Sequence, residues 1–141
     1  MSTVLIVANQ TLPSQALAEA IAERVRAGIT SFYVVVPATP AGKGMTWDEE
    51  GSRREARERL DQFVAQLAEQ HVEADGEVGD RDPVSAVRDA LRNREVDEVV
   101  LSTFPPGISR WLGQDVPSKL RHNVGVPVLV VYEGAAAGAS A

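Results

Sequence analysis

The chain has 141 residues, no cysteine and a formal net charge of −6, from 14 basic and 20 acidic residues. The length suits one domain, and 44% hydrophobic with 24% charged residues is the balance of a folded globular protein rather than a disordered chain. The negative charge argues against nucleic acid and membrane surfaces as partners, and the absence of cysteine excludes disulfides and thiolate sites and fits a cytoplasmic protein.

The first predicted element is a strand over Thr3–Ala8. Its five consecutive apolar residues are too few for a membrane span, and no basic region precedes them as in a signal peptide. A helix follows, from near Pro13, a residue favoured in the first helical turn, to Gly28. The apolar stripe of this helix consists of Leu17, Ile21 and Val25.

A second strand is predicted over Ser31–Val36, where aromatic and β-branched residues follow one another. After a loop at Ala38–Met45, Thr46 and Glu49 have the spacing of a capping box, which predicts the start of a long helix. Apolar residues recur along it at helical spacing and form its expected buried face: Leu60, Phe63, Val64 and Leu67.

The third strand, Val72–Val78, is weaker because Gly76 interrupts it, and we expect it at an edge of the sheet. Asp82 then has the place of an N-cap and Pro83 that of the first helical residue. The residues expected to be buried on this third helix are Val84, Val87 and Leu91.

The remaining elements are a strand over Glu98–Ser102, a short helix over Asp115–His122 and a last strand over Val126–Tyr132. Strands and helices therefore alternate along residues 1–133, which we interpret as one α/β domain. The final residues, 134–141, lack bulky apolar groups and are predicted to be a disordered tail.

Alternating strands and helices of this kind form a doubly wound parallel sheet with helices on both faces. In such sheets ligands bind beyond the carboxyl ends of the strands, where the winding direction reverses. The loops after the first and fourth strands are therefore the first places to look for a site.

The C-terminal third, LSTFPPGISRWLGQDVPSKLRHNVGVPVLVV, resembles the signature of the universal stress proteins. In that family a strand ends in G-x-x-G, nine residues follow, and G-S or G-T opens a helix that leads to L-R-H and then to P-V-L-V-V. Leu120, Arg121 and His122 match the triplet, and Pro127–Val131 matches the last strand. With the N-terminal VLIVANQT, the resemblance covers residues 3–132 and implies the sheet order 3-2-1-4-5.

The chain departs from the family where the nucleotide-binding branch carries its phosphate loop. Aligning Gly113 with the late glycine places Leu101 and Phe104 where the two early glycines stand. Gln114 replaces the Ser or Thr that follows, and Asn9 replaces the Asp at the end of the first strand. Because glycine permits close backbone approach to phosphate, we predict that ATP and AMP bind weakly or not at all.

The polar residues after the first and fourth strands remain candidates for a small polar or anionic ligand. Hydroxyl groups, backbone donors and a guanidinium are groups that bind such ligands, although a rigid Pro-Gly turn is the favoured interpretation of the fourth-strand loop. The candidate ligand-binding residues are Asn9, Gln10, Thr11, Ser102, Thr103, Gly107, Ser109, Arg110 and Gly113.

Metal binding and catalysis are not expected. Asp80 and Asp82 supply fewer oxygen ligands than Ca²⁺ or Mg²⁺ requires, and Asp82 is better explained as a helix cap. The chain has no G-x-S-x-G elbow, phosphate-binding G-x-x-x-x-G-K-S/T loop or G-x-G-x-x-G fingerprint. A small hydrolase or transferase using Asn9, Ser102 and Arg110 is the least favoured alternative, because no His or Glu base is near.

The sequence thus predicts a binding or regulatory module of the universal stress protein type, without turnover and without a cofactor. The alternative is a member of the same family that binds AMP or ATP. No helix follows Val126–Tyr132, so this strand forms an exposed apolar edge that favours a homodimer, as the resemblance also implies.

Overall fold

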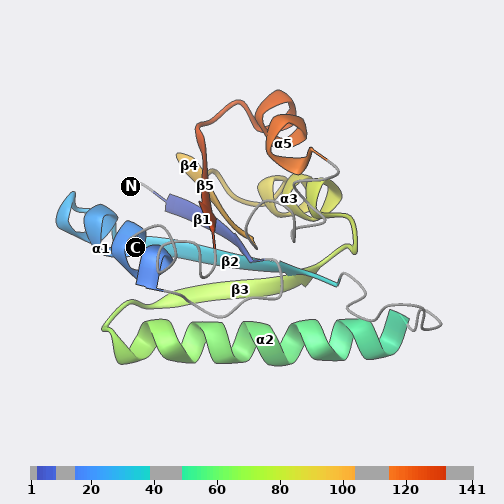
Figure 1. The fold of residues 1–141 in the computed structure, drawn as a ribbon, viewed down its shortest axis with the longest axis horizontal. Coiled ribbons are helices and arrows are strands. Elements are labelled where there is room, and N and C mark those ends of the chain that lie inside the picture. Colours follow the sequence, from blue (N-terminus) through green and yellow to red (C-terminus); the bar gives the residue numbers. More distant parts are fainter. Residues whose placement is uncertain (1–2, 9–14, 39–48, 104–114, 133–141) are drawn as a thin grey trace.

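The computed structural model describes residues 3–8, 15–38, 49–103 and 115–132, which form one five-stranded parallel sheet of order β3-β2-β1-β4-β5 (Figure 1). The predicted doubly wound fold and strand order are therefore confirmed. The strands are β1 (Thr3–Ala8), β2 (Ser31–Pro37), β3 (Ala74–Gly79), β4 (Glu98–Thr103) and β5 (Val128–Tyr132). The helices of the described residues are α1 (Gln15–Arg26), α2 (Glu49–Glu69), α3 (Pro83–Leu91) and α5 (Val116–Val124).

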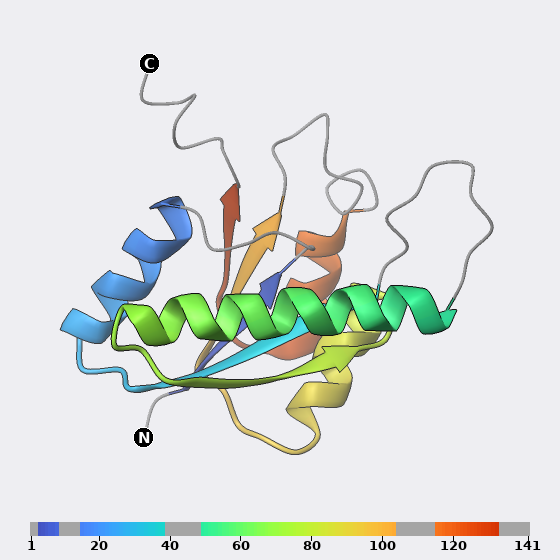
Figure 2. The same ribbon diagram turned by 90° about the horizontal axis from the view of Figure 1, so that it is seen from below.

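Two helix layers cover the sheet. Helices α1 and α2 pack on one face, where Phe63 and Leu17 are completely buried, and α3 and α5 pack on the other, around Leu120 (Figures 1 and 2). Residues of β1 alternate between the two cores, with Ile6 in the first and Leu5 in the second. Successive side chains of a strand point to opposite faces of the sheet, so a strand that is buried on both faces needs apolar residues at successive positions.

The central position of β1 follows from the same pattern. Val4, Leu5, Ile6 and Val7 have no exposed surface, and β1 pairs with β2 on one side and β4 on the other. By contrast β3, the strand with the interrupted apolar run, lies at an edge of the sheet as predicted.

Two strands begin two residues later than predicted, because the preceding helix ends in a turn. Beyond α2, Val72 N–H donates to Leu67 O at 2.9 Å and His71 has a positive φ of 65°, so Val72 belongs to the helix end and β3 starts at Ala74. Beyond α5, Gly125 adopts φ 67°, the left-handed conformation that commonly ends helices, and β5 starts at Val128.

The predicted buried residues of two helices are partly wrong. Val25 is 43% exposed, because residues spaced by four drift about 40° around a helix at each step, so a stripe begun at Leu17 leaves the core by the third position. On α3 the fully buried positions include Ala86 and Ala90, whereas Val84 and Leu91 lie at the margin of the core, partly buried.

Close packing of α3 on the sheet explains why a residue as small as Ala86 lies at the contact with β3. A Cβ added to Gly79 would lie only 2.6 Å from the Cβ of Ala86. The helix therefore lies against the end of β3 at a distance that leaves space for small side chains alone. No helix in the described part of the chain is long and apolar enough to span a membrane.

Candidate functional site

The winding direction of the sheet reverses at β1. From β1 the chain goes to β2 and β3 on one side, and it later returns to β4 and β5 on the other. Ala8, the last residue of β1, pairs with Ser102 near the end of β4. The two strand ends from which the candidate ligand loops continue are therefore direct neighbours, at the place where doubly wound folds bind ligands.

Ser102 and Thr103 are the two candidate residues that fall within the described chain, and both are fully buried. Ser102 follows Val100 of the first core by two positions and therefore lies on the α1 and α2 face, whereas Thr103 lies on the α3 and α5 face. Each residue takes part in a further interaction, so neither is unpartnered. Their hydroxyl groups consequently point to opposite sides of the strand and do not form one joint donor pair.

The face that carries Ser102 has small side chains at the same end of the sheet. Ala8 and Ala38 belong to the first core, and Ala38 N–H donates to Gly79 O at 3.1 Å, which ties the end of β2 to that of β3. Ala8, Ala38 and Ser102 are themselves buried, so a ligand at this end would lie beyond the strand ends, where doubly wound folds bind ligands. This end of β1, β2 and β4 is the candidate site.

The other candidate residues lie outside the described chain. They are Asn9, Gln10, Thr11, Gly107, Ser109, Arg110 and Gly113. The chain departs from the family's phosphate loop at Asn9, Leu101, Phe104 and Gln114, and of these four positions only Leu101 lies among the described residues. It lies within β4, fully buried in the second core, and the strand continues through Thr103, one residue beyond its predicted end.

Asp82 is a helix cap, as predicted. Its Oδ2 accepts a hydrogen bond from Ser85 N at 3.2 Å and another from Ser85 Oγ at 2.8 Å, and Asp80 Oδ1 accepts one from Asp82 N at 2.9 Å. Among the described residues no group of three or more His, Asp or Glu side chains is arranged to hold a metal ion. His122 is exposed on α5, where its Nδ1 lies 2.8 Å from Ser118 O.

A polar cluster at β2 and β3 was not predicted from the sequence. Tyr33 OH donates to Glu77 Oε1 at 2.7 Å, and the guanidinium of Arg94 lies 3.5 Å from the centroid of the Tyr33 ring. Burial first, and then the hydrogen bond to Glu77, raises the pKa of Tyr33 above its usual 10.0, and the nearby charge of Arg94 partly opposes this. The cluster joins the edge strand to the second core, away from the candidate site.

An ion pair between distant segments was also missed. Arg24 on α1 donates through Nε and Nη2 to the two carboxylate oxygens of Glu98 on β4, at 2.7 and 2.6 Å. The hydrogen bond with Glu98 raises the pKa of Arg24 above its usual value. No sequence signal links positions this far apart, because their contact depends on the order of the strands.

The order of the strands, with its reversal beside Ala8 and Ser102, defines a doubly wound α/β domain whose candidate site lies beyond β1 and β4. The model of the universal stress protein family matches residues 1–132, and the chain belongs to that family. Among curated proteins, none matches the chain by sequence.

Solved structures of the family share the fold. A universal stress protein from Archaeoglobus fulgidus in complex with dAMP is 22% identical, with a TM-score of 0.61 over 92% of this chain and 96% of that one. A family protein from Arabidopsis thaliana with AMP bound is 14% identical, with a TM-score of 0.62 over 97% and 95%. A third, in complex with cAMP, is 20% identical, with a TM-score of 0.54 over 94% and 98%.

Proposed function

We propose that this chain is a cytoplasmic binding module that takes a small polar or anionic ligand at the carboxyl ends of β1 and β4, without chemical turnover. The observation that carries the proposal is the pairing of Ala8 with Ser102, which makes neighbours of the two strand ends that precede the candidate residues in the sequence. The absence of known catalytic motifs in the sequence supports binding without turnover.

The ligand class that fits best is a small phosphate-bearing molecule. Three similar structures hold dAMP, AMP or cAMP, all of which combine a single phosphate with a nucleoside. In this chain Asn9 and Gln114 replace an acidic and a hydroxyl residue of the family's site, and Phe104 replaces a glycine. These changes remove close backbone approach and one donor, so we expect AMP to bind far more weakly than to a member with an intact loop.

Calorimetric titration with AMP and ATP, with and without Mg²⁺, tests the ligand class. We expect dissociation constants in the range of about 1 mM. A constant below about 10 μM that is lost in Arg110→Ala would establish the alternative, a nucleotide-binding member whose guanidinium replaces the missing loop contacts.

The mass of any small molecule released when the purified protein is denatured identifies a tightly held ligand directly. A phosphate-bearing molecule other than an adenine nucleotide would support the proposal, and an adenine nucleotide would favour the alternative. Release of product from an added ester or phosphoester, abolished in Ser102→Ala, would overturn the proposal that the module has no turnover.

A homodimer through the β5 edge belongs to the same proposal. In the described chain β5 has a strand partner on one side, β4, and its Leu129 is 39% exposed. Val128, Val130 and Tyr132 are partly buried on the opposite face of the strand. Light scattering at high micromolar concentration should give twice 15.1 kDa, and Leu129→Glu should give the monomer. A monomeric parent protein would reject the dimer.

A further inference from the structure

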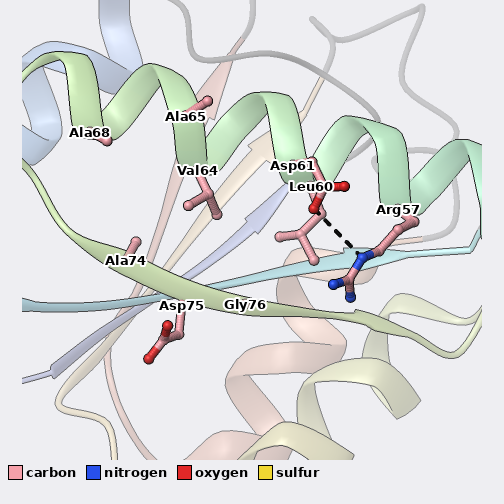
Figure 3. Close-up of a pocket in the computed structure, with 9 residues that line it drawn as sticks. All are labelled: Arg57, Leu60, Asp61, Val64, Ala65, Ala68, Ala74, Asp75 and Gly76. Carbon is pink, nitrogen blue, oxygen red and sulfur yellow. Dashed lines mark ion pairs between the residues drawn. The ribbon is translucent and has the colours of Figure 1, made fainter.

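A groove runs between α2 and the outer edge of β3, on the opposite side of the sheet from the β5 edge. It consists of two cavities of about 360 and about 470 Å³ that share Arg57 and Gly76 as lining residues. Figure 3 shows the first cavity, where Leu60 and Val64 of α2 point toward β3. Its remaining apolar lining is provided by small residues: Ala65, Ala68 and Ala74.

The groove gives access to the backbone of an edge strand. Within the described chain β3 pairs with β2 alone, so the N–H and C=O groups on its outer side have no strand partner. Gly76 lies in the middle of β3, and a Cβ there would be 2.5 Å from Leu60 Cδ1 and from Val34 O. The missing side chain lets Leu60 of α2 pack directly against the middle of the strand, while the outer edge of the strand has no strand partner in the described chain.

Two arginines lie at one end of the groove. Arg53 and Arg54 line its second cavity, and neither forms an ion pair within 4.0 Å in the part of the chain that the structure describes. Arg57 is paired with Asp61, with 3.6 Å between Nε and Oδ1. The lining also holds carboxylates: Glu50 and Asp61 on α2, and Asp75 and Glu77 on β3. On the α2 wall the arginines still outnumber the carboxylates, which favours an occupant with carboxylates on the face turned to α2.

A second copy of this chain fits the groove poorly. Two β3 strands paired edge to edge would bring Asp75 and Glu77 of one copy next to those of the other, and like charges on neighbouring strands are destabilising. Asp75 is exposed and points away from α2 (Figure 3), so it is free to repel an identical strand. The occupant therefore has a different sequence.

We propose that the groove binds an extended acidic segment of a partner protein, which adds a strand to β3 and directs carboxylates to Arg53 and Arg54. Strand addition supplies affinity through backbone hydrogen bonds, and the side-chain pockets supply specificity. Because β3 runs from Ala74 beside Ala68 to Val78 beside Arg53, the segment has apolar residues at one end and acidic ones at the other, on the same face.

Two labelled synthetic peptides test the proposal on the full chain. Val-Thr-Val-Thr-Glu-Thr-Glu suits a strand parallel to β3, and the reversed sequence suits an antiparallel one. Fluorescence anisotropy should detect binding of one of them, weakened by added salt. Matched peptides with lysine in place of glutamate should bind at least about tenfold more weakly.

The variant Arg53→Glu/Arg54→Glu should weaken binding of the acidic peptide by at least about tenfold. The control variant is Arg59→Glu/Arg88→Glu, which makes the same charge change at two exposed residues that line neither cavity, and it should bind as the parent does. Both substituted residues are exposed on the surface of α2, so the test variant should fold normally, which circular dichroism checks.

A second measurement separates strand addition from simple charge attraction. Bound peptide should slow the hydrogen exchange of amides within residues 74–79, because outward N–H groups become hydrogen-bonded. Neither peptide binding, equal binding by the lysine peptides, or binding without protection of β3 would each overturn the proposal. Self-association of the chain that is lost in Arg53→Glu/Arg54→Glu would overturn it in favour of a second copy.

Discussion

Tyr33 and Glu77 join two neighbouring strands through one hydrogen bond, with 2.7 Å between the phenol oxygen and Glu77 Oε1. The bond crosses from β2 to the edge strand β3, whose opposite edge borders the α2 groove. It therefore helps to fix the position of a strand that has a neighbour on one side only in the described chain. Two charges of opposite sign act on the phenol, which makes its titration informative.

The pKa of Tyr33 should respond in opposite directions to the loss of its two charged neighbours. Glu77→Gln should lower it, because the anionic acceptor disfavours the phenolate, and Arg94→Met should raise it, because the guanidinium favours the phenolate. Phenolate absorbance in a Tyr132→Phe background isolates Tyr33, since the chain has two tyrosines. Equal titration curves in the two variants would contradict the cluster.

The same group should affect stability at alkaline pH. Its folded pKa lies above the unfolded value near 10, so its contribution is fully present below pH 10 and is lost as the pH rises through the folded pKa. Urea unfolding measured across that range should show a loss of free energy that is smaller in Tyr33→Phe. If parent and variant keep a constant difference throughout, Tyr33 is not the titrating group.

The ion pair between Arg24 and Glu98 should stabilise the fold measurably. Both side chains are mostly buried, with exposed fractions of 15% and 22%, and the contact is bidentate. Arg24→Ala should cost about 1–3 kcal/mol of unfolding free energy, and Arg26→Ala on the exposed side of α1 should cost less than about 0.5 kcal/mol. A double-mutant cycle with Glu98→Gln measures the coupling, and a coupling of zero would show that the pair adds nothing.

Gly79→Ala should destabilise the protein by about 1–3 kcal/mol, since the new Cβ would lie 2.6 Å from the Cβ of Ala86 and 3.2 Å from Val35 Cγ1. Ala86→Gly removes the first of these clashes at a cost of about 1 kcal/mol in helix propensity. The double variant should therefore lose less free energy than the sum of the two single variants in urea unfolding. Strict additivity would mean that α3 does not press on this strand end.

Asp82→Ala should cost about 1 kcal/mol, because the first turn of α3 loses its capping acceptor. Asp82→Asn keeps an oxygen acceptor and should retain most of the stability. Thermal unfolding of the three proteins distinguishes them, and an equal loss in both variants would assign the effect to charge rather than to the cap.

The parts of the fold that the sequence predicts best are the strands whose residues are almost all buried. The strands β1, β2 and β4 each contain an uninterrupted apolar run because they are buried on both faces, so their positions could be predicted directly. The order of the strands was predicted from the family resemblance. The buried residues of a helix are harder to predict. A row of apolar residues spaced by four gradually turns away from the core, and close packing against the sheet favours alanine over valine. Val25, Val84 and Leu91 were misjudged for these reasons.

The candidate site was predicted in outline. Strand alternation places the ends of β1 and β4 side by side, and Ala8 and Ser102 do pair. Successive side chains of a strand point to opposite faces of the sheet, so Ser102 and Thr103, although both predicted as ligand groups, lie on different faces. Contacts that depend on register, such as Tyr33 with Glu77, require knowing which strands are neighbours, and the α2 groove requires knowing how close Gly76 allows the helix to come.

The central place of β1 has a consequence for how the protein is made. β1 leaves the ribosome before the other four strands of the sheet, yet one of its neighbours, β4, begins only at Glu98. Through most of translation the nascent chain therefore exposes one edge of its most completely buried strand, and parallel pairing across such a sequence distance is slow. A chain that stalls before β4 is synthesised would carry this unpaired edge, which makes such fragments natural substrates for chaperones.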